Sequence, residues 1–362
     1  MNLWLLAVSL AWTQGAASFD DLVSQAAAAR ERNDVPRAIE LYSQAVQLRP
    51  NWVSGWLFLG SLQYTAGSYT AARDALTHFI ETAPDPGPAF ALRALCEFEI
   101  GEYERSLADI QNSTTLGGPN LRVKEETLRY YKSLALTRLG RFDDALNNDS
   151  FFAQRQATSP DILVAVGLAG LRMSLLPREI KQDQQDLLMS AGRAALEFMA
   201  GDEKRAAEAF ENLSQHFPQA PGVHSLYGYF LLASDLHRAV VEFKRELEIA
   251  PTNPEACILL AWALLMQKNP SAALPYAETA EEKSPGASTA QLVLGRSLSE
   301  TGHLAAGIAH LERALQLAPD DLEIHIALAD AYSRSGRTDD AQRQRLQCLQ
   351  MTKDGANRVA LP

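Results

Sequence analysis

The sequence predicts an all-α solenoid built from stacked helix-turn-helix units, and three recurring features predict it. Prolines recur about every thirty-four residues, and a small residue precedes each of them by eleven or twelve positions. Apolar residues between these marks are spaced three or four apart, which is the period of a helix face and not of a strand. A repeat of this length is typical of arrays in which each helix pair completes its core against its neighbours. The recurring prolines are Pro50, Pro84, Pro218, Pro251, Pro285 and Pro319.

The unit from Ser288 to Pro319 shows how the pattern produces two helices. Apolar residues follow one helix face before Gly302 and a second face after it. Gly302 is expected to close the first helix, because glycine adopts the left-handed conformation past a helix end at little cost. Asn33 takes the matching place in the first unit, and asparagine is the next most tolerant residue there. Glycines at the same place in other units are Gly67, Gly101, Gly140, Gly201 and Gly336.

One unit carries, in order, a large residue, a glycine, an alanine, an aromatic residue and the terminal proline, as Trp56, Gly60, Ala72, Phe79 and Pro84. This order resembles the motif of the tetratricopeptide repeat (TPR) family, and similar units extend over nearly the whole chain after residue 18. The resemblance implies about nine repeats in a right-handed superhelix. It also implies that the first helix of each pair lines a concave wall where partners bind. The chain looks like a signal-bearing TPR protein of the bacterial envelope.

The N-terminal segment 1–18 has the layout of a secretory signal peptide. Leu3 to Trp12 is an apolar run of ten residues, too short to span a bilayer, and small residues follow from Gly15. We expect cleavage between Ala16 and Phe19, export to the periplasm or the extracellular space, and a mature protein without stable membrane insertion. The alternative is an uncleaved hydrophobic helix that caps the first repeat of a cytoplasmic protein.

The rest of the chain is expected to form two blocks separated by an unpaired helix. The front block, 19–160, holds about four repeats, and the later ones depart from the motif. Ser106 replaces the small alanine, and Asp149 stands where an aromatic residue is expected. The segment 161–186 reads as an unpaired apolar helix with a linker.

The rear block, 187–352, holds about five repeats. Its last helix, predicted over Asp339 to Thr352, is rich in arginine and glutamine and is interpreted as a polar end cap. Residues 353–362 are expected to form a flexible tail.

The formal net charge of −11 is spread along the chain. A diffuse negative balance disfavours binding to nucleic-acid backbones and to anionic membrane surfaces. Cys96, Cys257 and Cys348 lie in different repeats, so their Cα atoms are expected to be too far apart for disulfides.

No nucleotide-binding, metal-binding or nucleophile motif was found in the sequence, so we expect no catalytic, cofactor or metal site and no enzymatic activity. His224 and His325 occupy the large-residue position of the motif, where a packed, hydrogen-bonded imidazole is expected.

The positions that the family resemblance assigns to the concave wall carry an apolar band with aromatic residues and methionines. Such a band suits a hydrophobic segment or an amphipathic helix of a partner. The alternative is that these side chains pack between neighbouring first helices, or against the apolar helix from Ile162 to Leu175. Trp262 stands at the centre of the band, with Tyr229 and Arg296 one repeat away on either side. The candidate partner-binding residues are Tyr130, Leu134, Phe198, Met199, Tyr229, Leu232, Ile258, Trp262, Leu265 and Met266.

The leading functional hypothesis is an exported, non-catalytic scaffold that binds a partner protein or peptide. A second hypothesis is a periplasmic, chaperone-like holdase that shields exposed apolar segments. A third is a cytoplasmic TPR adaptor whose N-terminus is not cleaved.

Overall fold

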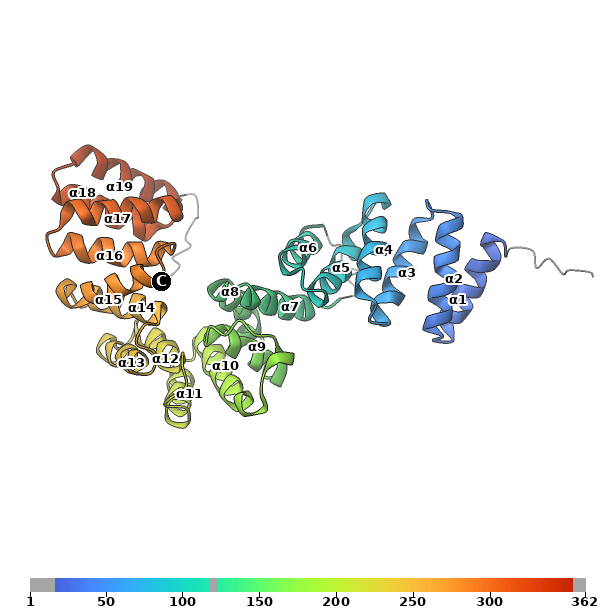
Figure 1. Cartoon of the computed structure of the whole chain (residues 1–362), viewed down its shortest axis with the longest axis horizontal. Coiled ribbons are helices and arrows are strands. Elements are labelled where there is room, and N and C mark those ends of the chain that lie inside the picture. Colours follow the sequence, from blue (N-terminus) through green and yellow to red (C-terminus); the bar gives the residue numbers. More distant parts are fainter. Residues whose placement is uncertain (1–16, 117–122, 354–362) are drawn as a thin grey trace, which may run out of the picture. The chain divides into compact units, whose positions relative to one another are not determined.

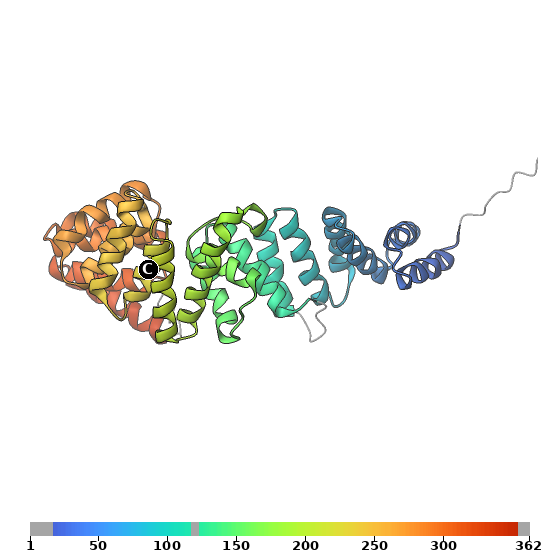
Figure 2. The ribbon, with the colours of Figure 1, turned by 90° about the horizontal axis from the view of Figure 1, so that it is seen from below.

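The computed structural model describes residues 17–116 and 123–353, and these residues contain nineteen α-helices and no β-strand. The chain divides into two compact units, one that ends at Asp149 and one that begins at Ser150. Within each unit successive helix pairs lie side by side (Figure 1 and Figure 2). Most of the predicted signal peptide and of the predicted tail, residues 1–16 and 354–362, falls outside the described residues.

The first unit holds four helix pairs in its described part, except that the end of the last helix, residues 150–154, belongs to the second unit. The second helix of each pair packs on the first, and the next pair follows directly. The last pair is joined across its helices by a hydrogen bond of 3.0 Å from Ser133 Oγ to Asp149. The helices are α1 (Phe19–Glu31), α2 (Val35–Leu48), α3 (Val53–Thr65), α4 (Tyr69–Thr82), α5 (Gly87–Glu99), α6 (Tyr103–Leu116), α7 (Glu125–Arg138) and α8 (Phe142–Gln154).

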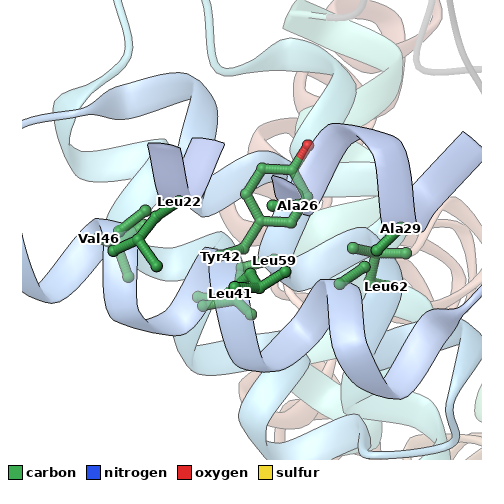
Figure 3. Packing of buried hydrophobic residues seen from close by; sticks show 11 residues of the cluster. Leu22, Ala26, Ala29, Leu41, Tyr42, Val46, Leu59 and Leu62 are labelled. Carbon is green, nitrogen blue, oxygen red and sulfur yellow. The ribbon is translucent and has the colours of Figure 1, made fainter. Parts of the chain in front are cut away.

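Each helix pair of the first unit buries part of its apolar surface against the next pair. Figure 3 shows this for Tyr42 of α2, which packs with side chains of α1 and α3. The Tyr42 ring also contacts the rings of Trp52 and Phe58, with centroids 6.0 and 5.5 Å apart. The core of one hairpin is therefore completed by its neighbour, as expected for a repeat array. Other members of this cluster are Leu22, Ala26, Ala29, Leu41, Val46, Leu59 and Leu62.

The turns inside the helix pairs adopt the conformation that the sequence predicts. Asn33 has a φ of 59°, and the six predicted turn glycines have φ values from 73° to 95°. In the pair α14–α15, which lacks a turn glycine, Lys268 takes this place with a φ of 60°. A side chain at such a position is strained, which explains the recurrence of glycine there.

The second unit contains one additional helix, α9, and five helix pairs from α10 to α19. Two short 3₁₀ turns, Pro177–Glu179 and Gln182–Gln184, connect α9 to α10. The helices are α9 (Pro160–Gly170), α10 (Gln185–Met199), α11 (Glu203–His216), α12 (Val223–Leu231), α13 (Leu236–Ile249), α14 (Pro254–Met266), α15 (Pro270–Lys283), α16 (Ser288–Glu300), α17 (Leu304–Leu317), α18 (Leu322–Arg334) and α19 (Thr338–Lys353).

Helix α9 packs closely on α10, so the segment 161–186 is not a linker between two blocks. A Cβ built on Gly167 would lie 2.0 Å from the carbonyl oxygen of Leu188, and one built on Gly192 would lie 1.9 Å from that of Leu163. Only glycine permits such a close approach of two helix backbones. The helix was expected to be unpaired because Pro177 and a polar stretch follow it before the next repeat begins. Both α9 and the turns after it belong to the second unit.

The carbonyl group of the repeat-terminal proline is bonded in the same way in four units. The residue six positions after the proline bonds to its carbonyl oxygen through a side-chain N–H. This residue stands at the large-residue position of the motif. The expectation of hydrogen-bonded imidazoles at His224 and His325 is thus confirmed. The four contacts are Trp56 to Pro50 at 2.8 Å, His224 to Pro218 at 3.0 Å, Gln291 to Pro285 at 3.0 Å and His325 to Pro319 at 2.9 Å.

The last helix, α19, was interpreted from the sequence as a polar end cap, but its outer side also carries apolar residues. Leu346 and Leu349 are 57% and 59% exposed, beside the expected arginines and glutamines. All three cysteines are free. Within residues 17–116 and 123–353, no helix combines the length and the apolar character needed to cross a membrane.

Candidate interaction surface

The predicted band divides between the two units. Tyr130 and Leu134 lie on α7 of the first unit, and the other eight residues lie on α10, α12 and α14 of the second or directly after them. Half of the band is buried inside its own unit and is not available to a partner in this conformation. The buried members are Leu134, Leu232, Ile258, Trp262 and Leu265.

Helix α14 explains most of this burial. Every residue from Ala256 to Leu265 is buried, so the helix has no solvent-facing side over that stretch. A helix that is apolar all round is typically enclosed by its neighbours. Trp262 is only 6% exposed, and the Arg296 guanidinium of the next hairpin covers its ring. The interpretation of Trp262 as an exposed central anchor is therefore wrong, and the alternative of packing between first helices holds for it.

The exposed members of the band lie together at one end of the first helices. Phe198 and Met266 are 36% and 43% exposed, and Met199 and Tyr229 are half-buried. Phe198 and Met199 end α10, Tyr229 lies near the end of α12, and Met266 ends α14. First helices of stacked hairpins run in the same direction, so their ends share one edge of the array. We call Phe198, Met199, Tyr229 and Met266 the apolar edge.

Aromatic contacts fix the first part of the apolar edge. The Phe198 ring packs edge-on against Tyr229 and against Phe230, with centroids 6.3 and 5.4 Å apart. Phe230 in turn stacks on the buried Phe210 of α11, at 4.9 Å. Phe198 is thus held by the core beneath it while more than a third of its surface faces solvent.

A recess of about 580 Å³ adjoins Met199. The end of α8 and the turn between α10 and α11 form its walls. Asp202 and Arg205 line the recess and pair with each other at 2.6 Å, and Arg205 also approaches Glu197 at 3.5 Å. The apolar edge therefore borders a polar, charge-paired rim at its α10 end. Other residues of the lining are Ala153, Gln154, Gln156, Ala200, Gly201 and Glu203.

Buried ionisable groups occur where the sequence departs from the family motif, in the pair α5–α6. Asp109 receives two hydrogen bonds from Arg93, of 2.6 and 3.0 Å. Glu97 lies 3.8 Å from the same guanidinium, and its second carboxylate oxygen has no hydrogen-bond partner. Burial and the neighbouring Asp109 charge raise the pKa of Glu97 to about 7. The Ser106 hydroxyl, which replaces the motif alanine, is also buried without a partner.

The pair α7–α8 shows a second case. Asp149 is fully buried and accepts hydrogen bonds from Ser133 and from Asn148. Burial raises its pKa to about 7, although both hydrogen bonds oppose that shift. The repeat motif has an aromatic residue at this position, so the Asp149 carboxyl group occupies a buried site that usually holds an aromatic ring. The sequence flagged Ser106 and Asp149 as departures but did not reveal that both would be buried.

No group of three or more metal-ligating side chains was found in the described residues. Cys96 lies in the core of the first unit, and burial raises the pKa of its thiol to about 12. This thiol is therefore a packing group and not a nucleophile.

Two segments of the chain match models of the tetratricopeptide repeat, residues 23–87 in the first unit and 298–344 in the second. The chain thus carries TPR repeats at both ends, and together with the all-helical structure this makes it an α-solenoid. Repeats of this kind generally mediate protein–protein interaction through the surfaces that stacking creates.

Similarity to individual proteins covers smaller parts of the chain. Protein O-mannosyl-transferase TMTC1 of Homo sapiens is 36% identical over 56 residues, which are 16% of this chain and 6% of the length of that relative. The solved structure of MamA from residue 41 to its end, from Desulfovibrio magneticus RS-1, has a TM-score of 0.41 at 21% identity and covers 46% of this chain and 96% of its own. Another MamA crystal structure has a TM-score of 0.39 at 19% identity. The match covers 45% of this chain and 96% of the MamA chain.

Proposed function

We propose that this protein is a non-catalytic interaction scaffold that binds a partner protein or peptide at the apolar edge of its second unit. The observation that carries the proposal is the grouping of Phe198, Met199, Tyr229 and Met266 at one edge, each with part of its side chain exposed. Aromatic side chains held rigidly by a core are the residues that most often supply binding energy. Methionine adapts its shape to different apolar partners.

The chemistry of the edge favours an apolar segment of the partner, such as one face of an amphipathic helix. The charge-paired rim of Asp202 and Arg205 beside Met199 suits the polar flank of such a segment. The buried residues of the predicted band, Trp262 among them, are not part of the proposed contact.

The experiment begins with capture of partners by the purified protein from its native host, followed by mass spectrometry. Binding of the identified partner is then measured for the double variant Phe198→Ser, Met266→Ser. We expect at least a tenfold loss of affinity, since two anchor truncations of about 1–2 kcal/mol each reach that size. The matched control is Leu346→Ser, Leu349→Ser, because these leucines are more exposed than the edge residues but lie on α19.

Equal affinity of the edge variant and wild type contradicts the proposed site. A protein that captures no stoichiometric partner but suppresses aggregation of unrelated clients is a holdase instead. Export and cleavage between Ala16 and Phe19 are proposed from the N-terminal pattern. Mass measurement of the protein from its host tests this, and an intact Met1 terminus contradicts it.

A further inference from the structure

Three buried ionisable side chains connect the start of α12 to α13. Glu246 is fully buried and accepts hydrogen bonds from the backbone N–H groups of Gly222 and Ser225, at 2.8 and 3.2 Å. Glu242 is 4% exposed, and one of its oxygens lies 2.6 Å from Nδ1 of His224. The loop before α12 and the first turn of that helix are therefore held by carboxylates of the neighbouring helix.

The His224 ring faces a hydrogen-bond acceptor on each side. Its Nδ1 lies 2.6 Å from the Glu242 carboxylate, and its Nε2 lies 3.0 Å from the carbonyl oxygen of Pro218. A neutral imidazole carries one N–H and can serve only one of these acceptors, whereas the imidazolium carries two and serves both. The geometry is thus fully satisfied only when His224 is protonated.

The surrounding charges support the protonated ring. The second oxygen of Glu242 accepts from Arg245 at 2.7 Å, and Glu246 lies on the same helix face. From α11, the side chains that border the recess beside His224 are the uncharged Ser214 and Gln215. Gln219 of the loop and, from α13, the cation Arg245, the anion Glu248 and Ile249 also line it. Further along the hairpin, Arg238 bonds to Tyr227 and Glu211 and not to this set. The Glu255 carboxylate of α14 pairs with Arg172.

The hydrogen bond to Glu242 raises the pKa of His224, and burial opposes this shift. Because the pKa is raised, the stabilisation is complete below the ordinary histidine value of about 6.5 and is lost as the pH rises through the higher value of the folded protein.

Two other hairpins have the same proline contact without the same charge requirement. Gln291 donates to Pro285 and cannot titrate in this range. His325 donates to Pro319, but its Nδ1 faces the amide group of Gln344, which can present either an acceptor or a donor. Gln291 also donates to the Glu281 carboxylate, but its amide does not titrate, so only at His224, among these positions, does a titratable ring face a carboxylate.

We propose that the segment from Pro218 to Ser225 is a pH-sensitive latch, closed on α13 while the His224 ring carries two protons and loosened when it loses one. Loss of the proton removes the donor from one acceptor atom, either Oε2 of the buried Glu242 or the carbonyl oxygen of Pro218, while Arg245 still donates to Oε1 of Glu242. The affected backbone leads into α12, so the opening is local to the junction of α11 and α12.

The latch is tested by hydrogen exchange of the full-length protein at pH 6 and pH 9, with rates corrected for intrinsic exchange. We expect protection of the peptide covering residues 217–226 to fall about fivefold at the higher pH, which corresponds to about 1 kcal/mol, the typical contribution of one hydrogen bond. The internal control is the peptide that follows Pro319, where His325 should show no such change. Equal protection of residues 217–226 at both pH values overturns the latch.

Two variants separate the latch from general pH effects. Glu242→Gln gives His224 an amide partner, as His325 has in Gln344, and His224→Gln replaces the titratable ring with an amide that can still donate to Pro218. Both should abolish the pH dependence in residues 217–226, and the second provides the test if the first does not fold. A variant that keeps the full wild-type response contradicts the role of the pair. Nitrogen NMR of labelled histidine gives a direct reading, since a single ring proton on His224 at pH 6 also overturns the proposal.

Discussion

The guanidinium group of Arg296 lies over the indole ring of Trp262, with its central carbon 4.9 Å from the ring centroid. The two residues belong to the first helices of successive hairpins, so this contact joins α14 to α16. Arg296 is itself paired with Glu300 at 3.4 Å. Cation–π packing of this kind stabilises the interface between hairpins and removes the tryptophan from solvent.

Replacing Trp262 with alanine is expected to lower the free energy of unfolding by about 3–5 kcal/mol, because it truncates a buried aromatic side chain and leaves a cavity. Met266→Ala, four residues later on the same helix, should change it by no more than about 1 kcal/mol, since that side chain is 43% exposed. Urea unfolding of both variants checks the prediction. Equal costs at the two positions would show that Trp262 is not a core residue.

Gly167→Ala and Gly192→Ala should each destabilise the second unit by about 3 kcal/mol, the upper end for overpacking, because the new methyl group meets a backbone carbonyl that cannot turn aside. Gly286→Ala is the matched control. No atom lies within 4 Å of a Cβ built there, and the change is expected to stay within about 0.5 kcal/mol. Thermal unfolding followed by circular dichroism distinguishes the three variants. A tolerated Gly167→Ala would contradict the close contact of α9 with α10.

The stability of the first unit should fall as the pH rises from about 4.5 to 7, because of Glu97. The unfolded chain releases the Glu97 proton near 4.5, whereas the folded protein keeps it up to about 7. Ionisation in this interval favours the unfolded state. It lowers the free energy of unfolding by an amount on the order of 1–3 kcal/mol, and the loss levels off above pH 7. Glu97→Gln cannot ionise and should be more stable than wild type at pH 8 but not at pH 4.

Unfolding of wild type and Glu97→Gln at both pH values measures this difference, and the subtraction removes the contributions of other titrating groups. Glu104→Gln on the exposed side of α6 is the control and should track the wild type. If Glu97→Gln is less stable than wild type at pH 8, the carboxylate is instead stabilised by Arg93 and the predicted sign is wrong.

Trp56→Phe should cost about 1 kcal/mol, the typical value of one hydrogen bond. The change removes the indole N–H that donates to Pro50 and keeps an aromatic ring to stack on His78, whose ring centroid lies 4.4 Å away. Chemical unfolding gives the value. A neutral result would indicate that water replaces the donor at the Pro50 carbonyl group, and that this recurring contact is dispensable in the first unit.

The repeat architecture was largely predictable from sequence because it depends on local rules. A turn between two helices requires one residue with positive φ, and glycine adopts this conformation most easily. The regular spacing of Gly302 and its counterparts therefore predicts where the turns lie. The packing of α9 on α10 depends instead on two glycines, Gly167 and Gly192, that face each other only after folding. Spacing along one helix does not reveal which residue of another helix will meet it.

The candidate surface was predictable only in part, for a related reason. Helical period places Trp262 and Met266 on the same face of α14, but it does not say which of the two a neighbouring side chain covers. The Arg296 side chain covers Trp262, while Met266 at the helix end stays exposed. His224 was expected to be hydrogen-bonded, but its carboxylate partner could not be predicted, because Glu242 is eighteen residues away on another helix.

The ion pair between Arg172 and Glu255, at 2.8 Å, joins residues 83 positions apart in a fold whose contacts mostly link adjacent hairpins. This separation has a consequence for synthesis on the ribosome. At about 5–20 residues per second, roughly 4–17 s pass between translation of Arg172 and translation of its carboxylate partner. Four further helices, α10 to α13, and the start of α14 must be translated before this ion pair can form. Nascent chains of this protein thus pass through an interval in which the segment after α9 is open to chaperones and proteases.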